Sequence, residues 1–293
     1  MLKKILSGWQ RSDHDTYRRA YERFGGSLCA HPAILAHLDS RGAGPVAFYH
    51  KEVQGQIVGA YFVDSNDVIA HPATKAPVIF DNIILPMDPG HRTYLPARSK
   101  RLSHRHRGQF LNFAYGAVNR RTICLVKDEF SQKTRKNRRA ELNRFLDQGG
   151  EIHSVDSFGD DELARIYREL FIMRWPGGHP GHRHDELAAF IGAIRSMMFG
   201  HVLFYKGRPC AYDLIYRAEC PRWVYFDDHN GAMDPELNHF GLGSILLWLN
   251  IQTAREQCAG LGKEMIFSLG GAYEKWSYKK MWSHEHRLGR SLI

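Results

Sequence analysis

The stretch that decides the fold is Asn238-His239-Phe240-Gly241-Leu242-Gly243-Ser244, which stands between a predicted strand and a predicted helix. Glycines in such a turn let the backbone come close to a ligand, and the amides at the start of a helix can face a phosphate. The stretch therefore has the form of a phosphate-binding turn. A bare G-x-G pair also occurs in strand-to-helix turns for steric reasons alone, and this alternative stays open. No G-x-x-x-x-G-K-[ST] motif is present, which disfavours a nucleoside triphosphatase.

The elements around this turn alternate between helical and strand patterns. Apolar residues at helical spacing follow Asp160 and Asp185, and β-rich runs follow further along the chain. The expected elements are helices near 160–175 and 185–198, strands at 202–205, 211–216 and 223–226, a helix at 241–257 and a strand at 265–269. This order predicts an α/β (α+β) fold with a mixed central sheet flanked by helices, in which the last two strands pair in parallel across the helix.

The first half of the chain repeats this mixture on a smaller scale. Asp13 is placed to cap a helix that ends at Gly25-Gly26, and a second short helix is expected at 33–38. Runs at 46–49 and 56–63 predict a hairpin, and 78–85 predicts a further strand. We expect an N-terminal domain over 1–130, a basic linking helix over 131–150 and a C-terminal domain over 151–293.

Composition narrows the class of partner. The 293 residues carry 40 Lys and Arg against 31 Asp and Glu, a net charge of +9, which favours an anionic partner. The cations gather in two stretches, 98–107 and 131–144, which are expected to be an exposed loop or helix start and an exposed helix. Five scattered cysteines and the lack of a long apolar run favour a cytoplasmic protein, with at most peripheral contact with a membrane.

Asn238-x-x-Gly241-x-Gly243 resembles the acyl-coenzyme A motif of the GNAT acyltransferase superfamily, with Asn238 in place of Gln or Arg. The segment Phe267-Ser268-Leu269-Gly270-Gly271, followed by Tyr278-Lys279, looks like the strand, glycine turn and aromatic-lysine pair of the FemAB-like branch, and the basic helix also fits that branch. This resemblance implies tandem GNAT-like domains, the first of them degenerate, with the acyl-coenzyme A site in the second.

A resemblance over nearly the whole chain is carried by the opening Met1-Leu2-Lys3-Lys4, residues 17–26, the basic helix and the ending Gly271-Ala272-Tyr273-Glu274-Lys275. These look like the macrophage-inducible Mig family of Gram-negative bacteria. That family is associated with resistance to cationic antimicrobial peptides and with the inner membrane, and has also been described as a transcriptional activator. The resemblance implies a physiological role and no particular reaction.

The acyltransferase resemblance implies roles for individual residues. Phe240, Gly241, Leu242, Gly243 and Ser244, with Asn238, would hold the pyrophosphate of acyl-coenzyme A. Asp227, Asp228 and His229 are the candidates for accepting the proton of an amine, because the amine must be neutral to attack. Lys279 could neutralise the leaving thiolate or an anionic substrate. The expected substrate-binding residues are Arg135, Arg138 and Tyr278. The alternatives are that the acidic run only forms the turn after a strand and that Lys279 is a surface lysine beside a core Trp282.

The sequence also suggests three other functions, which we weigh in turn. His179, His182 and His184 have a spacing that could hold zinc, but they lack a cysteine or a helix to fix them, so we expect no metal. The two basic stretches could instead hold an anionic membrane surface on a non-catalytic protein. A DNA-binding regulator is the third, but no compact helix-turn-helix pattern is visible, so nucleic acid is not the expected partner.

Overall fold

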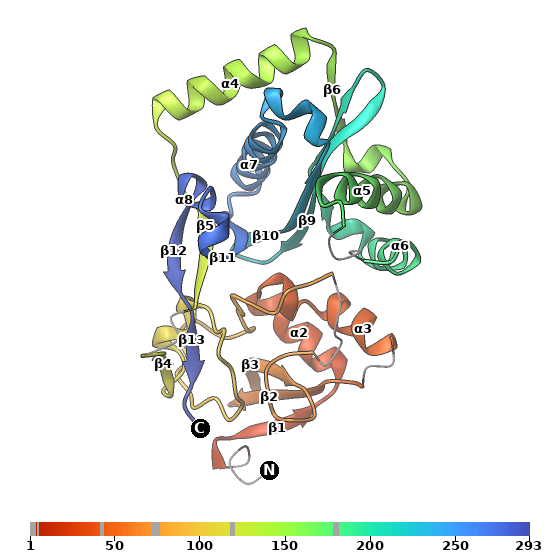
Figure 1. The fold of residues 1–293 in the computed structure, drawn as a ribbon. Helices are drawn as coiled ribbons and strands as arrows, with labels where there is room; N and C mark the ends of the chain where they lie inside the picture. Colours follow the sequence, from red (N-terminus) through yellow and green to blue (C-terminus); the bar gives the residue numbers. More distant parts are fainter. Residues whose placement is uncertain (1–3, 5, 42–43, 72–76, 118–120, 178–181) are drawn as a thin grey trace. The chain divides into compact units, whose positions relative to one another are not determined.

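The computed structural model describes the chain except for residues 1–3, 5, 42–43, 72–76, 118–120 and 178–181 (Figure 1). Its contacts divide the chain into two compact units. Unit 1 comprises Met1–Val126, Ala218–Tyr225 and Ser268–Ile293; unit 2 comprises Lys127–Arg217 and Phe226–Phe267. A division by contacts does not show whether the chain contains two copies of one fold. The domain boundaries expected at 130 and 150 therefore stay a prediction.

Unit 1 begins with the predicted helices and hairpin. Asp13 accepts a hydrogen bond from the Thr16 amide at 2.7 Å, and Gly25, with φ 78°, ends the helix. The elements are β1 (Trp9–Ser12), α2 (His14–Phe24), η1 (Leu28–Ala30), α3 (Pro32–Ser40), β2 (Ala47–Val53) and β3 (Gln56–Val63). Strands β2 and β3 pair antiparallel, and β1 joins the edge of β2. These helices and this hairpin are confirmed.

The strand predicted over residues 78–85 is wrong, because this segment makes only isolated bridges. Its backbone turns at Asn82, which has φ 44°. Further along, the amides of Ile84 and Leu85 donate to side chains, Ile84 to Ser27 Oγ at 3.0 Å and Leu85 to His106 Nε2 at 2.8 Å. A ladder needs these amides for a neighbouring strand, so an apolar run of strand length forms an irregular buried segment instead.

The first basic stretch is less exposed than predicted. Ser99, Ser103 and His106 are buried, whereas Arg98 and Lys100 between and beside them are exposed. A short 3-10 helix, η2 (His104–Gly108), follows. The expectation of an exposed loop or helix start is therefore correct only for part of the cations, because the residues between them are packed into unit 1.

Unit 1 is completed by strands that come from distant parts of the sequence. They are β4 (Phe113–Tyr115), β5 (Thr122–Val126), the end of β11 (Glu264–Gly271), β12 (Ser283–Arg287) and β13 (Gly289–Ser291). Between β11 and β12 lie η6 (Glu274–Trp276) and α8 (Lys279–Trp282). β5 pairs antiparallel with β11 and with β12, and β13 pairs with β4.

Unit 2 contains the long elements of the chain. They are α4 (Gln132–Asp147), β6 (Gly150–Ser154), η3 (Val155–Ser157), α5 (Asp160–Arg174), α6 (His184–Ala193), η4 (Arg195–Met197), β7 (Met198–Phe199), β8 (His201–Tyr205), β9 (Arg208–Glu219), β10 (Trp223–Met233), η5 (Pro235–Phe240) and α7 (Leu242–Leu261). Figure 1 shows α4 and α7 on one face of its strands and α5 and α6 on the other. The predicted helices and strands are present, although α6 ends at Ala193 and β9 and β10 extend further than expected.

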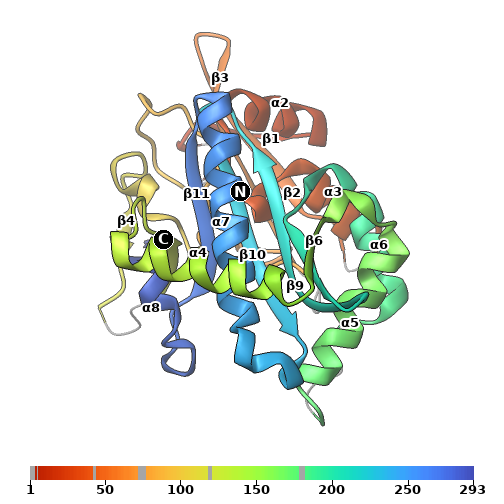
Figure 2. The same ribbon diagram turned by 90° about the horizontal axis from the view of Figure 1, so that it is seen from above.

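The described strands pair in the order β12-β5-β11-β10-β9-β8-β6, and β7 pairs with β9. β10 and β11 are neighbours although the 20-residue helix α7 lies between them in sequence. The last two strands were expected to be neighbours across this helix. Figure 2 shows α7 along these strands. The short 3-10 helix η5 joins the end of the central strand β10 to the start of α7, and the glycine stretch lies at this junction, as predicted.

Candidate functional site

The predicted phosphate-binding turn links η5 to α7. Gly241 has φ 71° and ψ 40°, a left-handed conformation that favours glycine, and its amide donates to the Asn238 carbonyl at 3.0 Å. The Gly241 carbonyl accepts from the amides of Ser244 and Ile245. Within the described residues, the amides of Leu242 and Gly243 have no acceptor, and no acidic side chain occupies the first turn of α7. We call residues 238–244 the glycine turn.

Space at the two glycines differs. A Cβ on Gly241 would have no atom within 4 Å, so this position opens to free space. A Cβ on Gly243 would come within 2.6 Å of the Met233 methyl at the end of β10. Gly241 thus leaves room for an outside group, whereas Gly243 lets α7 pack closely on the strand that precedes it.

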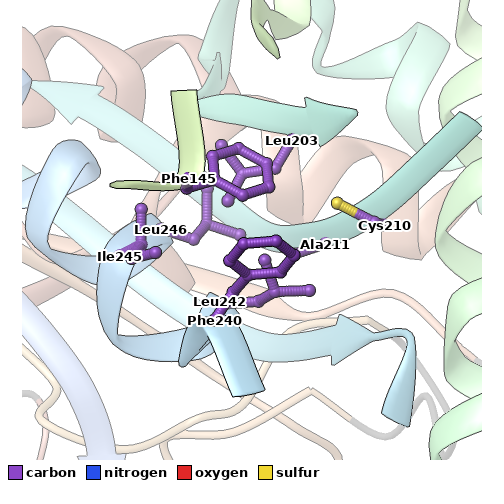
Figure 3. Close-up of a cluster of buried hydrophobic side chains, with 8 residues drawn as sticks. All are labelled: Phe145, Leu203, Cys210, Ala211, Phe240, Leu242, Ile245 and Leu246. Atoms are coloured by element: carbon purple, nitrogen blue, oxygen red, sulfur yellow. The ribbon is translucent and has the colours of Figure 1, made fainter. Parts of the chain in front are cut away.

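Buried aromatic side chains hold the glycine turn in place (Figure 3). The Phe240 ring lies 5.4 Å from that of Phe145 and 5.2 Å from that of Tyr205, measured between centroids. The cluster is Phe145, Leu203, Cys210, Ala211, Phe240, Leu242, Ile245 and Leu246. Because its members come from α4, β8, β9 and α7, four elements fix one turn.

The basic helix α4 approaches the glycine turn with its C-terminal end. Arg144 Nη2 donates to the His239 carbonyl at 3.3 Å. Arg138, a predicted substrate-binding residue, makes a 2.6 Å ion pair with Glu141. Arg135 is exposed nine residues before Arg144, about 13 Å away along the helix. Arg144 is therefore a cation in direct contact with the turn, and it was not among the site residues predicted from the sequence.

The three predicted proton acceptors lie inside β10 and not in a turn after it. The strand continues to Met233, so the alternative that Asp227, Asp228 and His229 only form a turn is wrong. Asp227 is buried, and the other two are half-buried. Burial, together with the neighbouring His182, lowers the pKa of His229 to about 3. Its Nε2 lies 3.4 Å from that of His182. His229 is thus a neutral and weakly basic imidazole at pH 7.

A further carboxylate, missed from the sequence, lies beside Asp228. Asp213 on β9 is 5% exposed, and its pKa is raised well above the ordinary value, first by burial and then by the charge of Asp228, while the Arg174 guanidinium opposes the shift. A Cβ on Gly231 would lie 2.3 Å from Asp213 Oδ1, so only glycine admits this carboxylate. Arg174 Nη1 donates to the Gly231 carbonyl.

Tyr167 of α5 faces the same carboxylates, and burial raises the pKa of its hydroxyl. We call Asp213, Asp228, Arg174 and Tyr167 the buried acid cluster. A carboxyl with a raised pKa is a stronger base than an ordinary aspartate, which suits it to exchange a proton with an amine. One signal in the sequence could have indicated the cluster, since Asp213 is the one charged residue in the apolar run 210–216.

The last two predicted site residues lie in unit 1. Lys279 Nζ donates to the Gly271 carbonyl at 3.2 Å, and Tyr278 is 47% exposed. Burial raises the pKa of Asp81 to about 6, against the opposing charges of Arg101 and Lys279. Trp282 is buried in the core of this unit. Asp81 is a second acidic group that the sequence did not indicate.

The described residues contain no group of three or more His, Cys, Asp or Glu side chains placed to hold a metal ion. His179 lies outside the described residues, His182 is beside His229, and His184 Nε2 lies 2.7 Å from Asp161 Oδ1. All five cysteines are buried, and none of them forms a disulfide. None of the described helices is long and apolar enough to cross a membrane.

The sequence matches a known family, and the fold is similar to solved structures. The sequence profile of the family described as Mig-14 matches residues 31–290. No curated protein matches the chain. Among solved structures, that of FemX is similar with a TM-score of 0.63 at 8% identity, covering 97% of each chain. The structure of L-PGS from Bacillus licheniformis is similar with a TM-score of 0.52 at 14% identity, covering 96% of this chain and 92% of that one. A tandem GNAT protein from the clavulanic acid biosynthesis pathway is similar at the lower TM-score of 0.46 and 10% identity, covering 97% of each chain.

Proposed function

The chain belongs to the Mig-14 family and has a FemX-like fold of the GNAT type, and from this premise we propose that it is an acyl-coenzyme A dependent N-acyltransferase. The observation that carries the proposal is the glycine turn, where Gly241 opens to free space and two amides of a 20-residue helix have no acceptor in the described part of the chain. Such a helix start attracts a phosphate through its amides and its dipole.

The residues present fit the donor. Its pyrophosphate would lie on the amides of residues 240–244, with the exposed Arg144 close to the same turn. From Met233, which packs on Gly243, the strand runs back five residues to Asp228, a distance of about 17 Å. A long pantetheine arm suits a separation of this order. When bound, acyl-coenzyme A supplies the acyl group as an activated thioester.

The chain's own residues would then prepare the amine. An ammonium group cannot attack, so a base must take its proton, and this role falls in our proposal to the Asp213 and Asp228 pair of unit 2, whose raised Asp213 pKa supports it. Asp227 and His229 line the same strand and stay proposed contributors, although the low pKa of His229 makes it the weaker base. Arg135 and Arg138 stay proposed substrate contacts in unit 2. In unit 1, Lys279 and Tyr278 stay proposed contacts to an anionic part of the substrate.

The physiological role that we propose is resistance to cationic antimicrobial peptides, through acylation of an envelope-related or peptide amine. Acylation removes the positive charge of an amine, and such peptides act through positive charge. The proposed location is the cytoplasm, with peripheral contact with the inner membrane through the cations of α4.

Release of free coenzyme A thiol tests the proposed reaction. Purified protein is incubated with acetyl-coenzyme A and a panel of primary amines, which includes cationic peptides, and the thiol is measured with a colorimetric reagent. We expect amine-dependent release that is lost in Gly241→Asp. The absence of release with every amine, in a folded protein that also fails to bind coenzyme A, would contradict the proposal.

A second candidate function is supported by the exposed surface of α4. Lys133, Arg135, Lys136, Arg139 and Arg144 are all exposed on this helix. Several cations on one helix attract an anionic membrane surface at about 1 kcal/mol each. A non-catalytic protein would then bind vesicles more tightly as their anionic lipid content rises and less tightly as salt rises, and vesicle sedimentation measures both trends.

A further inference from the structure

Unit 1 contains a large cavity that the proposed reaction does not use. It has a volume of about 1080 Å³, at the upper end of the range of ligand-binding pockets. All of its described lining residues belong to unit 1, and they come from residues 68–71, 78–80, 83, 98–101, 121 and 290–293. A smaller cavity of about 270 Å³ shares Lys100, Arg121 and Arg290 with it. We call the larger one the unit 1 pocket.

Cationic side chains are concentrated at the unit 1 pocket. Those that line it are Arg98, Lys100, Arg101, Arg121 and Arg290, and no acidic side chain is among the lining residues. In the described part of the chain, none of the five makes an ion pair, and Arg101 alone makes a side-chain hydrogen bond, to the Phe80 carbonyl at 3.2 Å. The described side chains at the lining therefore carry an excess of positive charge.

The backbone that carries these cations is fixed from several sides. The Arg98 carbonyl accepts from the Ile69 amide, and the Arg101 carbonyl accepts from the Ile83 amide. Between them, the Ser99 amide donates to Ser291 Oγ at 2.8 Å. Three cations of the pocket therefore project from a segment that is already ordered, and binding an anion there requires little further ordering of the backbone.

The wall of the unit 1 pocket is aliphatic. Its apolar side chains include Ile69, Val78, Ile79, Ile83, Leu292 and Ile293. Three of them, Ile79, Leu292 and Ile293, are large hydrophobic residues that are 41%, 48% and 46% exposed. Exposed apolar side chains that gather at one pocket indicate a surface that a partly apolar ligand can cover.

We propose that the unit 1 pocket binds one phosphate-bearing amphiphile, with the phosphate among Arg98, Lys100, Arg121 and Arg290 and an alkyl chain on the aliphatic wall. Guanidinium groups match the geometry of phosphate oxygens, and several cations suit a phosphate better than a singly charged carboxylate. An alkyl chain fits the wall better than a nucleobase does, because Phe80 and His71 are the only aromatic rings among the described lining residues, and His71 is buried. This site is independent of the glycine turn, which lies in unit 2.

Calorimetric titration with three probes tests both halves of the proposal. n-Octyl phosphate carries the head and the chain, n-octyl glucoside carries the same chain on a neutral head, and inorganic phosphate carries the head alone. All are used below the micellar concentration. We expect octyl phosphate to bind at least tenfold more tightly than either of the others. Equal binding of inorganic phosphate would overturn the amphiphile, and equal binding of octyl glucoside would overturn the role of the cations.

Matched variants assign the binding to this pocket. The double substitution Arg121→Gln with Arg290→Gln should weaken octyl phosphate binding at least tenfold, whereas Arg92→Gln, at an exposed arginine of the same unit outside the lining, should leave it unchanged. Ile79→Ser should weaken binding about threefold through lost apolar contact, and Leu111→Ser, at a 62% exposed residue elsewhere in unit 1, should not. Gly241→Asp should have no effect. Unchanged binding in the double variant, or no binding by the folded wild-type protein, would overturn the proposal.

Discussion

The glycine turn and the buried acid cluster lie in the same unit but are built in opposite ways. The turn is a backbone site, because its polar groups are amides, its glycine has a positive φ and its outer face is exposed. The cluster is a side-chain site, in which a carboxylate that is 5% exposed faces a second carboxylate and an arginine. A local sequence motif describes the first kind of site. The second exists only after β9, β10 and α5 have packed together.

The two regions should therefore be damaged by different kinds of substitution. Replacing a titratable carboxyl by an amide of the same shape should affect the cluster strongly, because burial raises the pKa of Asp213 and so makes its carboxylate a stronger base than that of an ordinary aspartate. Adding a charge without changing shape should affect the turn, because its groups face outward. The predictions below use these contrasts, beginning with the largest expected effect.

Asp213→Asn should reduce amine-dependent turnover of acetyl-coenzyme A by about 10²- to 10⁴-fold, the usual effect of losing a general base. Asp147→Asn, at an exposed position at the end of α4, should leave turnover unchanged. Steady-state kinetics should show the loss mainly in kcat. A normal kcat in Asp213→Asn would remove the cluster from the mechanism.

The same variant has a consequence for stability that does not depend on catalysis. Because the folded pKa of Asp213 is raised, the native state holds an extra proton above the unfolded pKa of about 4, and stability falls as the pH rises from there toward the folded value. Asp213→Asn should lack this fall, and urea unfolding at several pH values measures the difference.

Phe145→Ala should lower the free energy of unfolding by about 3–5 kcal/mol, because it removes a fully buried ring that packs on Phe240 and Tyr205. Phe145→Leu should have a smaller effect, since it retains most of the volume. Both changes lie under the glycine turn and away from the cluster, so coenzyme A binding should weaken in proportion to the loss of stability. Equal stability of the alanine variant and the wild type in urea would contradict this packing.

Much of the fold could be predicted because its signals are local. Asp13 and Gly25 mark both ends of α2, and the apolar periodicity after Asp160 marks α5. The segment 78–85 could not be predicted, since the groups that satisfy its amides, Ser27 and His106, are far away in sequence. Local patterns describe elements, but they do not identify the partners of a buried amide.

The candidate site also has a part that could be predicted from the sequence and a part that could not. The glycine turn could be predicted from its spacing and its position before a helix. Asp227, Asp228 and His229 were predicted from their position after an apolar run, but the same strand continues to Met233, so their environment differs from a turn. Asp213 was missed because its role depends on Asp228 and Arg174, which reach it from another strand and a helix.

His229→Gln should change how the free energy of unfolding depends on pH, by about 2 kcal/mol at pH 5. The imidazole stays neutral in the folded state down to about pH 3, whereas in the unfolded chain it takes a proton near pH 6.5. Its contribution is therefore present above pH 6.5 and is lost as the pH falls, by about 2 kcal/mol at pH 5. The difference in unfolding free energy between wild type and variant should vary with pH by this amount, and a pH-independent difference would contradict the burial of a neutral His229.

Calorimetric measurement of coenzyme A affinity for wild type, Gly241→Asn and Gly241→Asp tests the central claim most directly. Asn and Asp have the same shape, both tolerate the left-handed backbone, and Asp is also a favourable helix cap. We predict that the aspartate variant binds coenzyme A about tenfold more weakly than the asparagine variant while it is at least as stable. Equal affinity in the two variants, or no binding by the wild-type protein, would contradict a phosphate site at the glycine turn.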